Sequence, residues 1–345
     1  MKKIVAVTLA TALTLSLAAC GTKPAESAAP AESSATESKA AAAESVSVKF
    51  GNTQNEEDIQ TMALREVSDR LSKATDGAFE AKVYTSSSLG ETDDLTEQAM
   101  QGSAILTVSD PSRLAAFVKD YGILNMPYIF DDYTGLDKMM ETDLYSTWEQ
   151  AFADQGIWLV TSNWYSGARN FCLNKTVNKP EDLAGQRIRT IGNDICTKSV
   201  NAMGAVATPM SWSEVYTTIQ QKGLDGAEVQ TPSFYGTRLW EVVNTLNRTE
   251  HFQLIGSVVS GTTFRDSLSD EYKELFSTTF KDVGTEYQSK CVELSKQYEK
   301  EMVEKYGMTI NEDVDVQAFK DATAPVYDEL GYADVLKQLR SEMGA

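Results

Sequence analysis

The sequence predicts an α/β protein with two lobes that flank a cleft. Three observations predict this class: strand and helix patterns alternate over residues 47–109, they alternate again over residues 157–229, and the chain is long. Such alternation is typical of mostly parallel sheets covered by helices. The roughly three hundred residues from Ser45 onward are enough for two cores of ordinary domain size. Ligands of open α/β sheets lie at the carboxyl ends of strands, so we expect a site in the cleft.

The first alternation has the order β-α-β-α-β. It begins with a short strand at 47–51 and a helix at 58–74, whose apolar residues fall on one face. A strand at 78–84, a helix at 92–101 and a strand at 105–109 follow, separated by polar turns. We therefore expect three of these strands to share one sheet.

The second alternation follows a helix predicted over residues 135–155. Its predicted elements are strands at 157–164, 169–173 and 187–190, helices at 194–203 and 213–221, and strands at 224–229 and 254–259. The longest helical run comes last, at 270–306, and its apolar stripe includes Cys291, which we expect to be a buried core thiol. The sequence does not decide whether Cys172 and Cys196 form a disulfide. The lack of a C-x-x-C pair argues against a zinc or redox site.

The N-terminal segment has the pattern of an export signal followed by a tether. Lys2 and Lys3 precede an apolar run too short to span a bilayer comfortably, and it ends in Leu-Ala-Ala-Cys, a lipobox. We predict a signal peptide at 1–19 and lipidation of Cys20; the alternative is an ordinary signal peptide with a chance cysteine. The composition of residues 20–44 predicts a lipid-anchored flexible linker. The folded part is then extracytoplasmic, in the periplasm or on the outer face of the cytoplasmic membrane.

The chain is strongly acidic, with a formal net charge of −19 at pH 7. This balance argues against nucleic acid as a partner, because phosphates demand basic patches. An anionic ligand would also be repelled by the overall field, so its site must reverse the sign locally. Arginines in the cleft are therefore stronger evidence for an anion-binding site here than they would be in a basic protein.

Three sequence blocks between residues 158 and 251 carry the most specific signal. They read KPEDLAGQRIR at 179–189, TPMSWSEVY at 208–216 and DGAE at 225–228. Their order and spacing resemble the substrate-binding subunits of TRAP transporters, the dicarboxylate-binding-protein-like (DctP) family. The resemblance covers essentially the whole folded part, residues 45–345.

The resemblance implies a periplasmic-binding-protein-like fold, with a hinged cleft between two lobes and a long helix spanning both. Each lobe would be discontinuous in sequence. Lobe one would comprise residues 45–165 plus 253–294, and lobe two residues 166–252 plus 295–345.

The resemblance also implies that Arg189 grips the carboxylate of an organic acid. A guanidinium presents paired donors that match a carboxylate bidentately; the alternative is an exposed arginine at a strand end, in a surface ion pair. Arg169 lies twenty residues earlier. It is implied to join Glu228 and His251, the only histidine of the chain, in a buried network that either contributes to the site or only ties it to the hinge.

Two tryptophans are further ligand-binding candidates. Trp212 and Trp164 offer aromatic faces for the apolar side of a ligand or a sugar ring, unless they are ordinary core residues. From lobe one, the resemblance nominates Asn52, Glu91 and Asp110, polar side chains at strand ends that can hydrogen-bond ligand hydroxyls.

The chain departs from the family pattern directly after the DGAE block. Many relatives carry a ligand-contacting asparagine there, whereas this chain has Val229, followed by Gln230. Either Gln230 takes over the contact or the protein recognises a different acid.

These features predict a solute-binding protein that delivers one small organic-acid anion to the integral membrane subunits of a TRAP transporter. A sugar acid such as a uronate is the favoured ligand; a C4-dicarboxylate or another organic acid is the alternative, as is a solute-binding lipoprotein of an ABC transporter. An enzyme on a two-lobed frame is the rival class, but no nucleophile motif, phosphate loop or metal-ligand cluster supports it. We expect a monomer without cofactor or metal.

Overall fold

The computed structural model of the chain describes residues 45–344. The predicted signal peptide, the lipidation of Cys20 and the linker at 20–44 lie outside these residues. Within the described range, none of the helices combines the length and the apolar character needed to cross a bilayer.

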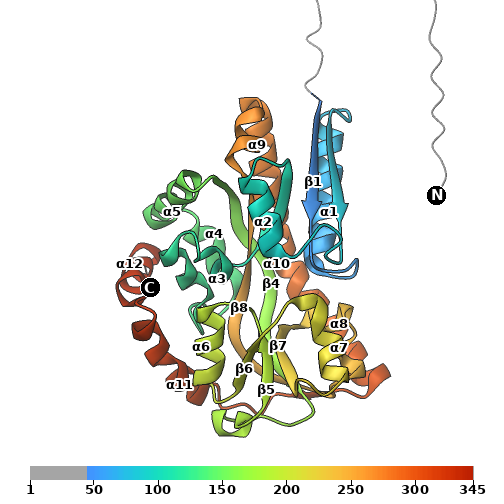
Figure 1. Cartoon of the computed structure of the whole chain (residues 1–345), viewed down its shortest axis with the longest axis vertical. Helices are drawn as coiled ribbons and strands as arrows, with labels where there is room; N and C mark the ends of the chain where they lie inside the picture. Colours follow the sequence, from blue (N-terminus) through green and yellow to red (C-terminus); the bar gives the residue numbers. More distant parts are fainter. Residues whose placement is uncertain (1–44, 345) are drawn as a thin grey trace, which may run out of the picture. The chain divides into compact units, whose positions relative to one another are not determined.

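One mixed sheet forms the frame of the described chain (Figure 1). Its order is β2-β1-β3-β8-β4-β7-β5-β6, and β9 pairs with β8 beside this path. We call β2, β1 and β3 the first wing and β7, β5 and β6 the second wing. Pairing is parallel within each wing and antiparallel where β8 and β4 join them. The strands are β1 (Val46–Gly51), β2 (Phe79–Tyr84), β3 (Ile105–Ser109), β4 (Ile157–Leu173), β5 (Arg187–Thr190), β6 (Val206–Pro209), β7 (Gly226–Gln230), β8 (Thr245–Gly261) and β9 (Thr309–Asn311).

The two central strands are longer than the sequence pattern predicted. Separate strands were expected at 157–164 and 169–173, and this expectation is wrong, because β4 runs through both as one strand of 17 residues. Gly167 has a φ of +109°, and the pairing of β4 with β8 shifts register around it. The polar, glycine-containing stretch therefore produces an irregularity inside the strand rather than an end.

Helices cover the sheet. They are α1 (Ile59–Ala74), α2 (Thr92–Met100), α3 (Pro111–Leu114), α4 (Leu136–Met139), α5 (Asp143–Asp154), α6 (Asp194–Ala202), α7 (Val215–Gln220), α8 (Thr231–Gly236), α9 (Thr262–Ser267), α10 (Asp270–Tyr306), α11 (Val316–Glu329) and α12 (Ala333–Met343). Short 3₁₀ turns are η1 (Lys119–Asn125), η2 (Tyr133–Gly135), η3 (Pro180–Leu183), η4 (Trp212–Glu214) and η5 (Leu239–Glu241). The α/β class predicted from the sequence is confirmed.

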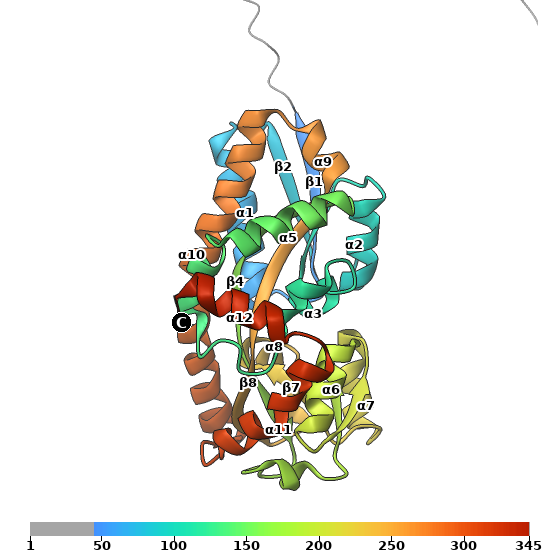
Figure 2. The same cartoon turned by 90° about the vertical axis from the view of Figure 1, so that its left-hand side faces the viewer.

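Helix α10 has the predicted bounds and connects the two wings. Ser269 caps its first turn by accepting a hydrogen bond from the Tyr272 backbone, and Gly307 ends it in the left-handed conformation. The helix packs along β4 and contacts α1 at one end and α8 at the other (Figure 2). Cys291 lies on its buried face, as predicted.

The single helix predicted over 135–155 is divided, so that prediction is wrong in its extent. Helix α4 ends at Met139, and α5 begins after Thr142, whose side chain accepts a hydrogen bond from the Tyr145 backbone. The C-terminal α12 packs against α5, where Glu342 accepts a hydrogen bond of 2.8 Å from the Leu144 backbone. The bounds of the two lobes, and hence the residues at which the chain crosses between them, remain a prediction.

Candidate functional site

A cavity that is partly open to solvent lies where the strand ends of the two wings meet. The carboxyl ends of β1, β3, β5 and β7 all contribute to its lining. Six predicted residues line it: Glu91, Asp110, Arg169, Arg189, Trp212 and Gln230.

Arg189 is buried on β5 with only 2% of its surface exposed. Its Nε and Nη2 both donate to the carbonyl oxygen of Met210, at 3.0 and 2.8 Å, and its guanidinium carbon lies 5.2 Å from the ring centre of Trp212. Among residues 45–344, no carboxylate forms an ion pair with it. Burial, together with repulsion from Arg169, lowers the pKa of Arg189 to about 10. The side chain remains cationic at neutral pH and lacks a counter-ion.

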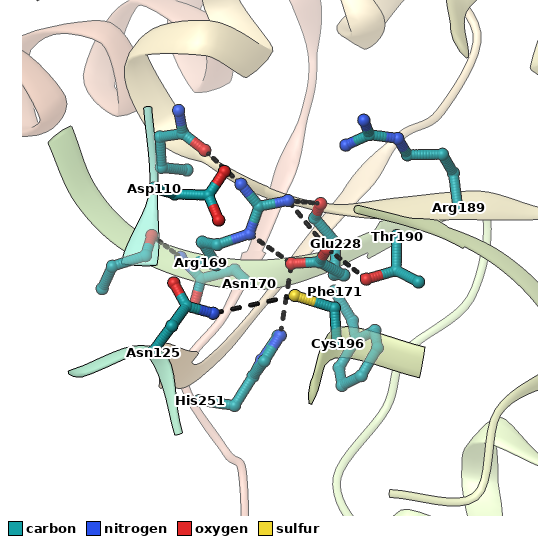
Figure 3. Close-up of polar contacts among 12 residues, drawn as sticks. Asp110, Asn125, Arg169, Asn170, Phe171, Arg189, Thr190, Cys196, Glu228 and His251 are labelled. Atoms are coloured by element: carbon teal, nitrogen blue, oxygen red, sulfur yellow. Dashed lines mark hydrogen bonds and ion pairs between the residues drawn. The ribbon is translucent and has the colours of Figure 1, made fainter. Parts of the chain in front are cut away.

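Arg169 on β4, by contrast, already has its counter-ion. Its Nε and Nη2 donate to the carboxylate of Glu228 on β7, and Nη1 donates to Gln230 Oε1 at 2.9 Å (Figure 3). Burial would raise the pKa of Glu228, but the charge and hydrogen bonds of Arg169, together with the neighbouring His251, outweigh this effect and lower that pKa to about 2. Thr190 Oγ1 also donates to Glu228, at 2.7 Å. Arg169 and Glu228 therefore form a neutralised, fully buried pair at the cavity wall.

His251 lies behind this pair and does not line the cavity. Its ring stacks on Phe171 with centroids 4.5 Å apart, and Nδ1 lies 2.8 Å from Thr249 Oγ1. Nε2 is 3.6 Å from Glu228 Oε2. Burial lowers the pKa of His251 despite the neighbouring carboxylate, so the imidazole is neutral at neutral pH. The predicted proximity of Arg169, Glu228 and His251 is present, but only Arg169 reaches the cavity.

Gln230 lines the cavity, but both ends of its amide are occupied. Its oxygen accepts from Arg169, and its Nε2 donates to Ser233 Oγ at 2.7 Å. Val229 lies on the opposite face of β7, in an apolar cluster of the second wing. Residue 229 therefore presents no side chain to the cavity in this protein.

A hydrogen-bond chain continues from Gln230 to helix α1. Ser233 Oγ donates to Asp58 Oδ2 at 2.6 Å, and Asp58 Oδ1 accepts from the Gln60 backbone at 2.9 Å, which caps α1. Gln60 Nε2 donates to Ser166 Oγ at 2.8 Å. Burial, opposed by these hydrogen bonds, raises the pKa of Asp58 to about 6.

The first wing contributes carboxylates and a hydroxyl to the cavity. Glu91 accepts a hydrogen bond of 2.7 Å from Ser213 Oγ of the second wing's 208–216 block. Asp110 caps α3, where it accepts from the backbone of Arg113 and from its Nε, each at 3.1 Å. Ser109 Oγ is buried and has no hydrogen-bond partner among the described residues.

Besides Glu228 and His251, two further predicted residues lie outside the cavity. Trp164 belongs to the core, where its ring stacks on Phe280 and its Nε1 donates to the Phe280 carbonyl at 2.9 Å. Asn52 supports the loop after β1, because its amide donates to Thr61 Oγ1 at 2.8 Å and accepts from the Gln54 backbone.

Sequence reasoning missed several polar lining residues, among them Gln60, Ser109, Arg113 and Ser233. Arg113 could have been found, since it follows Asp110 by three residues on a helix start, a spacing that favours an ion pair. Gln60, Ser109 and Ser233 belong to no sequence motif that would have marked them as lining residues.

The three cysteines of the described chain, Cys172, Cys196 and Cys291, are buried and free. The disulfide left open by the sequence is therefore not formed here. Residues 45–344 also contain no cluster of three or more side chains suited to a metal ion.

Known proteins resemble this chain over most of its length. The family described as bacterial extracellular solute-binding protein, family 7 (DctP), matches residues 50–334. A TRAP periplasmic solute-binding protein of Ochrobacterium anthropi, solved with bound L-fuconate, has a TM-score of 0.83 and 28% identity, covering 87% of this chain and 99% of its own.

Two further solved structures are similar. A TRAP periplasmic solute-binding protein of Actinobacillus succinogenes with bound L-galactonate has a TM-score of 0.82 and 27% identity, over 87% of this chain and 99% of that one. Another, from Fusobacterium nucleatun with bound sn-glycerol-3-phosphate, has a TM-score of 0.81 and 26% identity, over 87% and 100%. The predicted two-lobed architecture is confirmed by these structures. The chain belongs to the DctP family of bacterial extracellular solute-binding proteins, the solute-binding proteins of TRAP transporters.

Proposed function

We propose that the cavity binds one sugar acid, with Arg189 receiving its carboxylate. The observation that carries this proposal is that Arg189 is buried and cationic at the cavity wall, and that no carboxylate among residues 45–344 forms an ion pair with it. A buried charge is costly unless it is paired, so a carboxylate that enters the cavity supplies what the folded chain lacks. The bound L-fuconate and L-galactonate of two similar proteins support an acid of this class.

The other lining residues have complementary roles. Trp212, which lies over the Arg189 guanidinium, packs against the apolar side of the ligand. Glu91, Asp110 and Ser109 accept hydrogen bonds from its hydroxyl groups. Glu228 and His251 act from behind, by fixing the position and charge of Arg169.

The protein closes its lobes around the ligand and delivers it to the membrane subunits of the transporter, without changing it chemically. Contacts between segments that follow strands of different wings support such closure: Ser213 donates to Glu91, and Asn193 Nδ2 donates to Ser112 Oγ at 2.8 Å. The predicted lobes are residues 45–165 plus 253–294 and residues 166–252 plus 295–345, except that α12 packs against the core of lobe one.

The remaining predictions complete the proposal. The lipobox supports lipidation of Cys20, and we infer that the mature protein is a monomer tethered to the membrane by that lipid. Membership of the TRAP family replaces the alternative of an ABC-type binding lipoprotein.

The test is calorimetric titration of the folded chain with hexonates and hexuronates, before and after Arg189→Ala. Loss of the buried charge pair with the ligand costs about 3 kcal/mol, so we expect affinity to fall by at least about a hundredfold. Arg187→Ala is the matched control, because Arg187 lies on the same strand but is 45% exposed and pairs with Asp225. Wild-type affinity in Arg189→Ala, or equal losses in both variants, would contradict the role of Arg189.

A further inference from the structure

Three guanidinium groups line the cavity, and they differ in whether a carboxylate of the protein forms an ion pair with them. Arg169 is paired with Glu228, and Arg113 is paired with Asp110 and Asp93. Arg189 alone among these three has no carboxylate partner in the described chain. The cavity thus offers one unneutralised positive charge.

Arg113 would be a second anion-binding group if its partners were removed. Its Nε donates to Asp110 Oδ2 at 3.1 Å, and Nη1 donates to Asp93 Oδ2 at 2.5 Å. The two carboxylates are unequal. The Asp110 side chain is 12% exposed, whereas that of Asp93 is 63% exposed and hence largely screened by solvent. Asp110 is therefore the group that masks the positive charge of Arg113 within the cavity.

The cavity wall of the first wing is rich in acceptors. Asp110 and Glu91 present carboxylates there, and Ser109 contributes a buried hydroxyl that has no hydrogen-bond partner in the described part of the chain. Ligand hydroxyls can donate to these groups, but a second anionic group of a ligand would face like charges in a place shielded from water.

We propose that Asp110, by masking Arg113, makes the cleft selective for polyhydroxy acids with a single negative charge and against dicarboxylates. This inference rests on the proposed binding of an acid at Arg189. It goes further by assigning to an aspartate–arginine pair of the first wing the choice between singly and doubly charged ligands.

The experiment compares ligands that share a carbon skeleton and differ in one charge. Calorimetric titration at neutral pH uses D-galactonate against galactarate, D-gluconate against glucarate, and glycerate against tartronate. For every acid that binds, we expect the doubly charged counterpart to bind at least about tenfold more weakly, the result of like charges brought together in a buried site. Equal or tighter binding of the doubly charged member would overturn the proposal.

The variant Asp110→Asn provides a gain-of-function test. Asparagine has the same shape and also caps helices well, so α3 is retained, while Arg113 loses its buried counter-charge. We expect the preference for single charge to fall at least about tenfold, and the second substitution Arg113→Gln to abolish that gain. Asp93→Asn is the control: it removes an exposed partner of the same arginine and should leave the preference nearly unchanged.

The outcomes separate the two proposals. If none of the acids binds, the function proposed for Arg189 fails. If acids bind and depend on Arg189, but Asp110→Asn leaves the charge preference as it was, only the role of Asp110 is refuted.

Discussion

Replacing Asp58 by asparagine should make the stability of the protein less dependent on pH. Asp58 is 1% exposed and is held by hydrogen bonds from Ser233 and Gln60, with no cation paired to it among residues 45–344. Burial raises its pKa from 3.8 to about 6. The folded state therefore binds this proton more tightly than the unfolded state, so the contribution of Asp58 to stability is greatest below pH 3.8 and is lost as pH rises through 6.

The size of the effect follows from the two pKa values. A rise from 3.8 to about 6 corresponds to about 3 kcal/mol of lost stability once the group is ionised in both states. Between pH 4 and pH 7.5 the change is about 2.5 kcal/mol, because part of the titration already lies below pH 4. Asparagine cannot accept the Ser233 hydrogen bond through its amide nitrogen, at a cost of about 1 kcal/mol that does not depend on pH.

Urea unfolding of both proteins between pH 4 and pH 7.5 measures this difference directly. The free energy of unfolding of Asp58→Asn, relative to wild type, should rise by about 2.5 kcal/mol from the acid to the neutral end. The acid end serves as the internal control, since protonated aspartate and asparagine are similar in shape and both uncharged. Parallel pH profiles would refute the argument that burial disfavours the charged form of Asp58.

Two further predictions concern the ion pair at the cavity wall and the N-terminus. Arg169→Ala should lower the free energy of unfolding by about 3–5 kcal/mol, because Glu228 would stay buried without its partner, and it should also weaken ligand binding; unchanged urea unfolding and unchanged affinity would contradict this. Cys20→Ala should release the protein from the membrane fraction and abolish labelling by a radioactive fatty acid, whereas persistent labelling would argue against the lipobox.

Local signals in the sequence were sufficient for much of the fold. The bounds of α10 could be predicted because its signals lie in the segment itself. They are an apolar stripe along the helix, a serine cap before it and a glycine after it. The continuity of β4 could not, because only pairing with β8 shows that Gly167 is an irregularity rather than an end. That pairing is a long-range contact, which no local pattern records.

For the candidate site, too, some residues could be predicted from the sequence and others could not. Arg169 and Arg189 could be identified from motif spacing, and both line the cavity. Trp164 was nominated by its residue type, yet it packs in the core, because the position of α10 decides its burial. The ion pair between Arg113 and Asp93 could not be foreseen, since Asp93 comes from a different helix, α2.

The continuity of β4 and β8 has a consequence for the integrity of the protein. The two strands of 17 residues pair with each other along a ladder that passes from one wing to the other, with register shifts inside it. Separating the chain between the wings would leave unpaired backbone edges on both fragments, which are templates for aggregation. Neither lobe is therefore expected to survive excision, and a split-protein sensor made from this chain should be cut in a surface loop within one wing.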